Sequence, residues 1–171
     1  MAGKSVIPLL AISAWSGTGK TTLLKRLIPQ LCASGIRPGL IKHTHHEMDV
    51  DTPGKDSYLL RKAGADQVMV ASSQRWALMT ETPAAIKLEL RDLAAQFDEN
   101  ITDLILVEGF KGEDVPKIVL WREGVKGELS DLLDKKVIAV ASDVAIEVNM
   151  PRLNLNNVDE IAQFIVEWLA E

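Results

Sequence analysis

One glycine-rich stretch constrains the fold of this chain more than any other feature. Residues 14–21 read Ala-Trp-Ser-Gly-Thr-Gly-Lys-Thr and stand at the end of the apolar run 8–14. Leucines then recur at helical spacing at positions 23, 24, 27 and 31. An apolar strand, a glycine-rich loop and a Lys-Thr pair that opens a helix form the setting in which backbone N–H groups surround a phosphate. This order predicts a phosphate-binding loop after a buried first strand.

The residue types of this loop suit the phosphates and the Mg²⁺ ion of a nucleotide. Backbone N–H groups are expected to point at the phosphates, and Lys20 to reach the β- and γ-phosphates. The Thr21 hydroxyl is expected to take one Mg²⁺ position. Ala14 stands where the usual pattern has glycine, so an ordinary glycine-rich turn is the alternative. The predicted phosphate-binding residues are Ser16, Gly17, Thr18, Gly19, Lys20, Thr21 and Thr22.

Short apolar runs and stretches of helical spacing alternate along the rest of the chain. Such alternation predicts an α/β fold, here a mostly parallel sheet flanked by helices as in P-loop nucleoside triphosphatases. The length of 171 residues predicts a single domain over 1–171. The predicted strands are 8–14, 39–42, 67–71, 77–80, 104–107, 117–121 and 137–141, and the predicted helices follow the loop, span 56–63 and begin at Thr82 and Asn157.

Composition narrows the classes of partner and compartment. Hydrophobic residues make up 47% and charged residues 25% of the chain, as in folded water-soluble proteins. The net charge of -5 comes without a basic stripe, which argues against nucleic acid as a partner. No segment reads as a signal peptide or a membrane span, and the single Cys32 is expected to be a small core residue. These features predict a cytoplasmic protein with no membrane partner.

Glu108 ends the apolar run 104–107. Proteins with such a phosphate loop place a carboxylate at this point, where it orders Mg²⁺ through a water molecule. Glu108 is therefore predicted to be a catalytic residue together with Lys20. It is also predicted to order the metal ion together with Thr21. The alternative is a solvated acid at the end of a strand.

Several segments together resemble one family. They are Lys-His-Thr-His-His at 42–46, Asp-Thr-Pro-Gly-Lys-Asp-Ser at 51–57, Arg-Lys-Ala-Gly-Ala at 61–65 and Val-Glu-Gly-Phe-Lys at 107–111. With the loop, they resemble the MobB family of molybdopterin-guanine dinucleotide biosynthesis adapter proteins over most of the chain up to Lys111, and more weakly beyond. The resemblance implies a homodimeric GTP-binding protein with weak GTPase activity. It also implies a partner, the guanylyltransferase that attaches GMP to the molybdenum cofactor, and leaves open whether molybdopterin itself binds.

The segment after the second strand supplies further candidates. At the carboxyl edge of the sheet, Asp51 and Asp56 are expected to approach the γ-phosphate and Mg²⁺, with Asp51 in a catalytic role. As alternatives, Asp56 caps the next helix and Phe110 only packs. Lys111 is a candidate contact to phosphate or to an anionic pterin. The predicted nucleotide-binding residues outside the loop are Pro53, Gly54, Lys55, Asp56, Glu108, Gly109, Phe110 and Lys111.

Two further hypotheses concern a transition-metal site and the recognition of the guanine base. His43, His45 and His46 stand one and two residues apart, a spacing that suits Zn²⁺ or another transition metal, with a polar loop as the alternative. The Asn-Lys-x-Asp motif by which many GTPases read guanine is absent. Ser142 and Asp143, after a late strand, are therefore candidates to accept hydrogen bonds from guanine.

No arginine finger or water-orienting glutamine can be assigned from the sequence. Hydrolysis is therefore expected near the rate of an unassisted GTPase, on the order of 10⁻⁴ to 10⁻³ s⁻¹. Two alternatives remain: an ATP-dependent small-molecule kinase or ligase on the same fold, and a metallochaperone GTPase that uses the three histidines.

Overall fold

The chain divides into two compact units, which are described separately. The computed structural model describes residues 7–44, 50–82, 87–110 and 112–171. Unit 1 comprises Met1–His43 and Glu89–Glu171, and unit 2 comprises Thr44–Leu88. The expectation of one domain stays a prediction. Three residues singled out in the sequence lie outside the described residues, His45, His46 and Lys111, and so do residues 83–86 of the helix predicted from Thr82.

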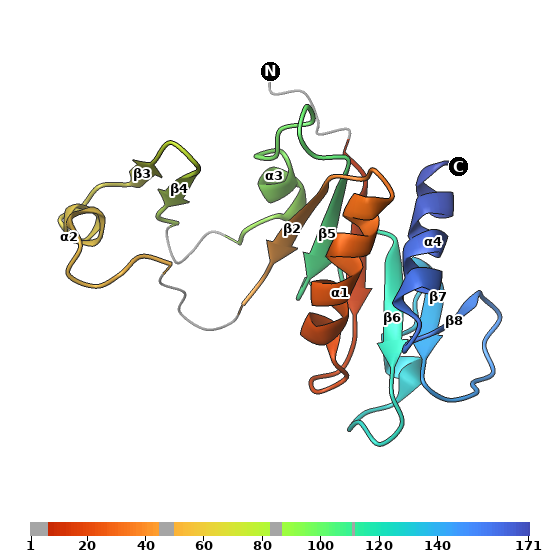
Figure 1. Ribbon diagram of the computed structural model, residues 1–171. Coiled ribbons are helices and arrows are strands. Elements are labelled where there is room, and N and C mark those ends of the chain that lie inside the picture. The colour runs from red at the N-terminus through yellow and green to blue at the C-terminus, as the bar shows by residue number, and fades with distance from the viewer. Residues whose placement is uncertain (1–6, 45–49, 83–86, 111) are drawn as a thin grey trace. The chain divides into compact units, whose positions relative to one another are not determined.

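Unit 1 is built on a parallel sheet of six strands in its described part. All neighbouring strands pair in parallel, so their carboxyl ends, drawn as arrowheads in Figure 1, meet at one edge. The predicted α/β fold is therefore confirmed. In spatial order the strands are β2 (Pro38–Lys42), β5 (Leu104–Glu108), β1 (Leu9–Ser13), β6 (Lys117–Trp121), β7 (Val137–Ser142) and β8 (Arg152–Asn154).

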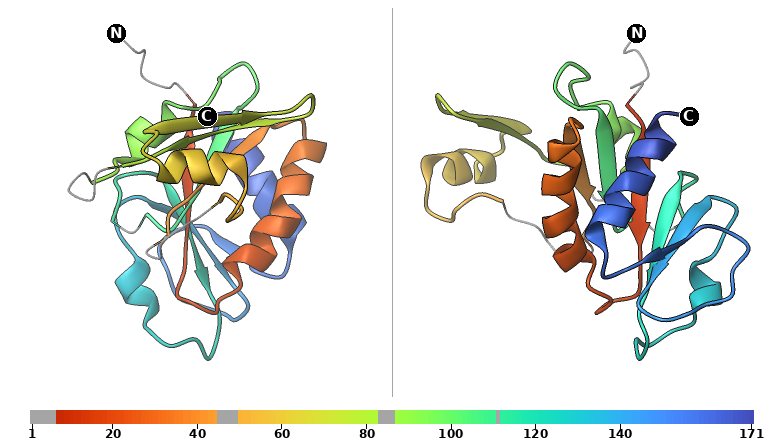
Figure 2. Two further views of the ribbon diagram at one scale, coloured as in Figure 1. Left: turned by 90° about the vertical axis from the view of Figure 1, so that its left-hand side faces the viewer. Right: turned by 45° about the vertical axis from the view of Figure 1, so that its right-hand side comes forward.

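Helices cover both faces of this sheet. Leu10 of β1 packs in one core with Leu27 and Ile161, whereas its neighbour Ala11 packs in the other core with Leu90. Strands buried on both faces read as continuous apolar runs, which explains why β1 and β5 are apolar up to their last residues, Ser13 and Glu108. Figures 1 and 2 show α1 and α4 side by side over the first face. The helices are α1 (Lys20–Ala33), α3 (Leu90–Ala94) and α4 (Val158–Leu169), with a short 3₁₀ helix η1 (Leu129–Leu132).

The strand order reverses at β1. After β1 the chain crosses to the β2 edge and returns through β5, and then continues on the other side of β1 through β6, β7 and β8. In parallel α/β sheets, ligands bind outside the carboxyl ends of the strands at such a reversal. The topology therefore places a binding site at the end of β1.

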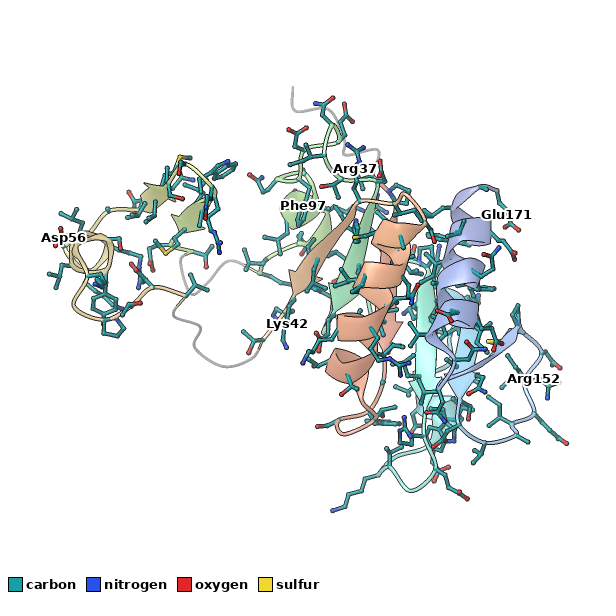
Figure 3. All side chains as sticks on the ribbon, in the orientation of Figure 1. Arg37, Lys42, Asp56, Phe97, Arg152 and Glu171 are labelled. Carbon is teal, nitrogen blue, oxygen red and sulfur yellow. The ribbon has the colours of Figure 1, made fainter. Side chains whose placement is uncertain are left out.

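An ion pair joins the two strands at the β2 edge at their amino ends. The backbone N–H and the Nε of Arg37 both donate to Oδ2 of Asp103 at 2.8 Å. Beside it, Phe97 packs on the backbone of β2, because a Cβ atom at Gly39 would lie 2.7 Å from the Phe97 ring. Figure 3 labels Arg37 and Lys42 at the two ends of β2 and Phe97 beside it.

Unit 2 consists of a helix and a hairpin. The antiparallel strands β3 (Gln67–Ala71) and β4 (Trp76–Thr80) follow the helix α2 (Asp56–Lys62). Arg61 of α2 donates to Oε1 of Glu81 at 2.8 Å, which ties the helix to the end of the hairpin. Gly64 has a φ of 114° and ends α2 as predicted, since only glycine adopts this conformation without strain.

Two expectations need correction. The helix predicted from Thr82 begins at Leu90, because Leu90 is buried whereas Leu88 is exposed, so that core packing selects the later start. Cys32 is exposed rather than in the core, since it follows the buried Leu31 on another side of α1. The strand β8 and the helix η1 were not predicted. The helix predicted to begin at Asn157 is confirmed as α4, and Asn157 is its N-cap, with Oδ1 accepting from the Glu160 N–H at 3.2 Å.

In the described part of the chain, no helix combines the length and the hydrophobicity that crossing a bilayer requires.

The ion pair between Arg37 and Asp103 predicts a pH dependence of stability. Its hydrogen bonds lower the pKa of Asp103 from its ordinary value of 3.8 to about 2. A lowered carboxyl pKa stabilises the fold above its ordinary value and loses this effect as the pH falls through the folded value. We therefore expect Asp103→Asn to lower the free energy of unfolding near neutral pH. The gap from the wild type should narrow from about pH 4 to about pH 2.

Urea unfolding at a series of pH values, followed by tryptophan fluorescence, measures this gap. Asp98→Asn is the matched control, since Asp98 lies nearby and bonds the neighbouring Asn100 instead. A gap that stays constant from neutral to acid pH would contradict the prediction.

Candidate functional site

The glycine-rich loop lies at the carboxyl end of β1 and runs into α1. Gly17 and Gly19 have φ angles of 83° and 100°, which side chains on L-residues rarely permit. Gly19 is the residue before α1, and its carbonyl accepts the first helical hydrogen bond, from the Leu23 N–H at 2.9 Å. The predicted phosphate-binding residues 16–22 thus lie together where the positive end of a helix dipole meets the reversal of strand order.

Hydrogen bonds hold the lysine over this loop. Nζ of Lys20 donates to the carbonyl oxygens of Ala14 at 2.9 Å and of Trp15 at 3.4 Å. Thr18 is buried, and its hydroxyl donates to the same Trp15 oxygen at 2.8 Å. The ammonium group is therefore already positioned above the backbone that an anion would approach.

Trp15 is fixed by a second loop. Its Nε1 donates to the carbonyl of Glu128 at 3.0 Å. A Cβ atom at Gly127 would lie only 2.4 Å from the indole ring, and Gly127 has a φ of 113°. Only glycine fits at position 127, so the loop after β6 packs directly on the phosphate loop.

Arg122, which the sequence reasoning missed, braces the other side of the loop. Its Nε donates to the carbonyl of Thr18 at 3.2 Å, and its Nη1 donates to Oδ2 of Asp143 at 3.1 Å. The other oxygen of Asp143 accepts from the Glu123 N–H at 3.0 Å. Both carboxylate oxygens are thus engaged within the chain, and Ser142 is buried with its hydroxyl oxygen accepting from the Val144 N–H. This geometry argues against Ser142 and Asp143 as readers of guanine.

The end of β5 brings Glu108 to the same edge. Its side chain is 12% exposed and lies 3.6 Å from Nζ of Lys42 at the end of β2. Its carbonyl accepts from the His43 N–H at 2.8 Å. Gly109 follows with a φ of 94°, and a Cβ atom there would lie 2.5 Å from the His43 carbonyl oxygen. Phe110 contacts the ring of His43, with 4.8 Å between the ring centroids.

Lys20 and Glu108 both border a cavity of about 280 Å³. Aromatic walls are supplied by Trp15 and Phe110. A cavity with apolar walls and a few polar groups is typical of small-molecule sites. The cavity lies beside the phosphate loop, on the side where Lys20 and Glu108 are found.

An ion pair between a buried lysine and a half-exposed aspartate also borders this cavity. Lys117 is only 5% exposed, and its Nζ donates to Oδ2 of Asp134 at 2.6 Å and to the carbonyl of Glu113 at 3.3 Å. Burial raises the pKa of Asp134 and the hydrogen bond from Lys117 lowers it, with a net shift downward. The sequence analysis did not predict this ion pair. Its one sign in the sequence is Lys117, a charged residue at the first position of an otherwise apolar strand.

The remaining predicted site residues belong to unit 2. Oδ1 of Asp51 accepts from the Thr52 N–H at 3.0 Å and from the Ser57 hydroxyl at 2.9 Å. Lys55, not Asp56, is the residue before α2, so Asp56 lies in the first helical turn rather than at the cap. Because Pro53, Gly54, Lys55, Asp51 and Asp56 lie in unit 2, their role beside the γ-phosphate stays a prediction.

Metal-binding side chains do not cluster in the described ranges: there, no group of three or more His, Cys, Asp or Glu residues is placed to hold an ion. His43 stacks on Phe110. Since His45 and His46 lie outside the described residues, the hypothesis of a three-histidine site stays untested.

The fold and the loop define this chain as an α/β protein of the P-loop type. A sequence model of the MobB family, described as molybdopterin guanine dinucleotide synthesis protein B, matches residues 9–143. The chain belongs to this family, and the resemblance read from its sequence is confirmed.

Relatives and solved structures agree with this assignment. The chain is 64% identical over 170 residues to the molybdopterin-guanine dinucleotide biosynthesis adapter protein of Escherichia coli strain K12, covering 99% of this chain and 97% of that protein. It is 50% identical to the adapter protein of the same name from Haemophilus influenzae, covering 95% and 90%. A crystal structure of molybdopterin-guanine biosynthesis protein B superposes with a TM-score of 0.78 at 26% identity, covering 95% of this chain and 99% of that one.

The hydrogen bonds that Arg122 makes to the loop and to Asp143 yield a prediction. Arg122→Ala removes a charged hydrogen bond to Thr18 and the partner of Asp143, so the loop loses its fixed shape. We expect the affinity for nucleoside triphosphate with Mg²⁺ to fall by on the order of tenfold. Isothermal titration calorimetry measures this, with Arg152→Ala as the matched control because the Arg152 side chain donates to the Ile146 carbonyl and not to the loop 14–21. Equal losses in both variants would rule out a specific role for Arg122.

Proposed function

We propose that this chain binds GTP with Mg²⁺ in the loop 14–21, hydrolyses it slowly, and acts as an adapter beside the guanylyltransferase that makes molybdopterin guanine dinucleotide. The chain belongs to a family of adapter proteins of this biosynthesis. The nucleotide, the hydrolysis and the enzyme partner are the proposed part.

The observation that carries the proposal is the geometry of the loop. Gly17 and Gly19 have the left-handed backbone conformation that occurs in the anion-binding turns of phosphate loops. Lys20 lies over that loop on the carbonyls of Ala14 and Trp15. A bound triphosphate would replace these carbonyls as the partner of the ammonium group, a charge-assisted contact that is stronger than the one it replaces.

Two oxygen donors suit the Mg²⁺ ion that accompanies the nucleotide. The Thr21 hydroxyl is exposed in the first turn of α1, and the Glu108 carboxylate lies at the end of the adjacent strand β5. Oxygen donors with room for water are what Mg²⁺ requires. When bound, Mg²⁺ would neutralise the charge that develops on the phosphates. Lys42, the present partner of Glu108, would then be available for phosphate.

Slow hydrolysis is expected because Arg122 is hydrogen-bonded to other groups of the chain. Arg122 is engaged by the Thr18 carbonyl and by Asp143, so its guanidinium shapes the loop instead of contacting the γ-phosphate. Positioning and Mg²⁺ alone support turnover on the order of 10⁻⁴ to 10⁻³ s⁻¹. Such a rate suits a protein that holds a nucleotide for a partner enzyme.

One observation favours a rival function. The cavity of about 280 Å³ beside Lys20 and Glu108 is large enough for a small acceptor. An ATP-dependent kinase or ligase would place its acceptor there, and so would an adapter that also receives an anionic pterin such as molybdopterin. Rapid turnover that depends on an added acceptor distinguishes the kinase or ligase from the adapter.

The proposed assembly is a homodimer, and the exposed apolar side chains of unit 2 support it. A helix and a two-stranded hairpin bury little surface by themselves. Clustered exposed apolar residues mark interaction surfaces. Those of unit 2 include Leu59, Leu60, Met69, Val70, Trp76 and Leu78.

The dimer predicts a mass change on mutation. We expect the wild type to sediment with twice the mass of one chain, and Trp76→Glu to weaken the dimer because it places a charge in an apolar contact. Ile101→Glu, at an exposed apolar residue of unit 1, is the matched control and should leave the mass unchanged. Analytical ultracentrifugation measures both. A wild-type mass of one chain at every concentration would contradict the dimer.

The nucleotide function predicts the effect of removing the lysine. Lys20→Ala loses the cation over the loop, so we expect GTP affinity to fall at least about a hundredfold, as for removal of a charged partner worth about 3 kcal/mol. Trp15 fluorescence reports binding and phosphate release reports turnover. Lys25→Ala, later in α1, serves as the control. Wild-type protein that binds no nucleotide would sink the proposal, and ATP preference with fast acceptor-dependent turnover would favour the rival.

A further inference from the structure

The nucleoside of a bound nucleotide would leave the loop toward a second cavity. Thr22 stands one residue beyond the Lys-Thr pair, on the side of the α-phosphate, and borders a cavity of about 260 Å³. The lysine and Glu108 border the opposite cavity, described above. Thr18, Thr22, Arg26, Arg122 and Asn156 are the polar side chains of the second cavity.

This cavity adjoins a third one along α1. The third cavity has about 300 Å³ and is bordered by polar residues from α1 and from the turn between β8 and α4. Arg26 and Asn156 border both cavities. A ribose and base that leave the loop past Thr22 would therefore extend along α1 toward the start of α4, the two helices that Figure 1 shows side by side.

Four of the polar side chains along this path have hydrogen-bond partners within the chain: Thr18, Arg122, Asn154 and Asn157. Arg122 bonds the Thr18 carbonyl and Asp143. Oδ1 of Asn154 accepts from the Asn156 N–H at 2.9 Å, and Oδ1 of Asn157 accepts from the Glu160 N–H at 3.2 Å. These groups maintain the turn and the helix cap, so they are not available to read a ligand.

Five other polar side chains that border the two cavities make no hydrogen bond or ion pair within the described part of the chain: Thr22, Arg26, Gln30, Asn156 and Asp159. Two of them stand in the turn at the start of α4: Asn156, which carries an amide, and Asp159, which carries the one carboxylate in the lining of either cavity. Both border the third cavity, and Asn156 also borders the cavity at the loop. Asn157 fixes the turn between them by capping α4. The backbone that carries them is therefore rigid, although the two side chains are unengaged.

We propose that Asn156 and Asp159 read the base of the nucleotide and select guanine. This inference rests on the proposed nucleotide function. The N1–H and the 2-amino group of guanine are donors that match the carboxylate of Asp159, and O6 and N7 are acceptors that match the amide NH₂ of Asn156. Adenine presents an N1 lone pair where guanine has a donor, which a carboxylate repels. Arg26, exposed on α1 between the cavities, suits stacking on the base.

Nucleotide analogues test this assignment. We would titrate the full-length protein with GTP, xanthosine triphosphate, inosine triphosphate and ATP, each with Mg²⁺, by calorimetry. In the wild type, inosine triphosphate should bind about tenfold more weakly than GTP, because it lacks the 2-amino group. In Asp159→Asn, GTP affinity should fall by about tenfold to a hundredfold, whereas xanthosine triphosphate should gain, since its 2-oxo group accepts from the new amide.

Control variants distinguish a loss of base recognition from a loss of phosphate binding. Asp92→Asn changes an equivalent exposed aspartate in the first turn of α3 and should leave the ratio of GTP to xanthosine triphosphate affinity unchanged. Asn156→Ala should weaken GTP but leave inorganic triphosphate unaffected, because the loop still binds the phosphates. If the wild type binds GTP, and Lys20→Ala abolishes this, but Asp159→Asn leaves the ratio unchanged, then the base assignment is overturned alone. If the wild type binds neither GTP nor triphosphate, the proposed function fails and the base assignment fails with it.

Discussion

The positive φ angles of Gly17 and Gly19 are the constraint on which the site depends. They allow the chain to leave a buried strand, turn tightly and enter a helix. The surrounding contacts maintain this shape: Thr18 and Lys20 bond the carbonyls of residues 14 and 15, and Arg122 bonds the carbonyl of residue 18. A loop held from both sides needs little reorganisation to receive an anion.

The parallel sheet converts this local geometry into a site. Because all its strands end at one edge, residues far apart in the sequence meet there: Lys20 after β1, Glu108 at the end of β5 and Arg122 after β6. The lysine and the carboxylate border one cavity, and the arginine borders another on the other side of the loop. The loop thus lies between two cavities, and in the proposed function the first would adjoin the phosphates and the second would receive the nucleoside.

The sequence predicted what depends on local pattern. The loop and the strands of the sheet centre were recognisable because burial on both faces demands continuous apolar runs. Features that depend on tertiary contacts were missed. Arg122 reads as an ordinary residue after a strand, and only the fold brings it to Thr18. The start of α3 at Leu90 and the exposure of Cys32 were decided by packing. The pair Asn156 and Asp159 emerges only once the partners of neighbouring polar groups are known.

The most direct test of the central claim is a crystal structure of the protein with a non-hydrolysable GTP analogue and Mg²⁺. The account predicts phosphate oxygens at hydrogen-bond distance, about 3 Å, from the backbone nitrogens of Gly17, Thr18, Gly19 and Lys20, with Lys20 Nζ moved from the carbonyls to the phosphates. A nucleotide bound at another place, with Lys20 still on the carbonyls of Ala14 and Trp15, would contradict it.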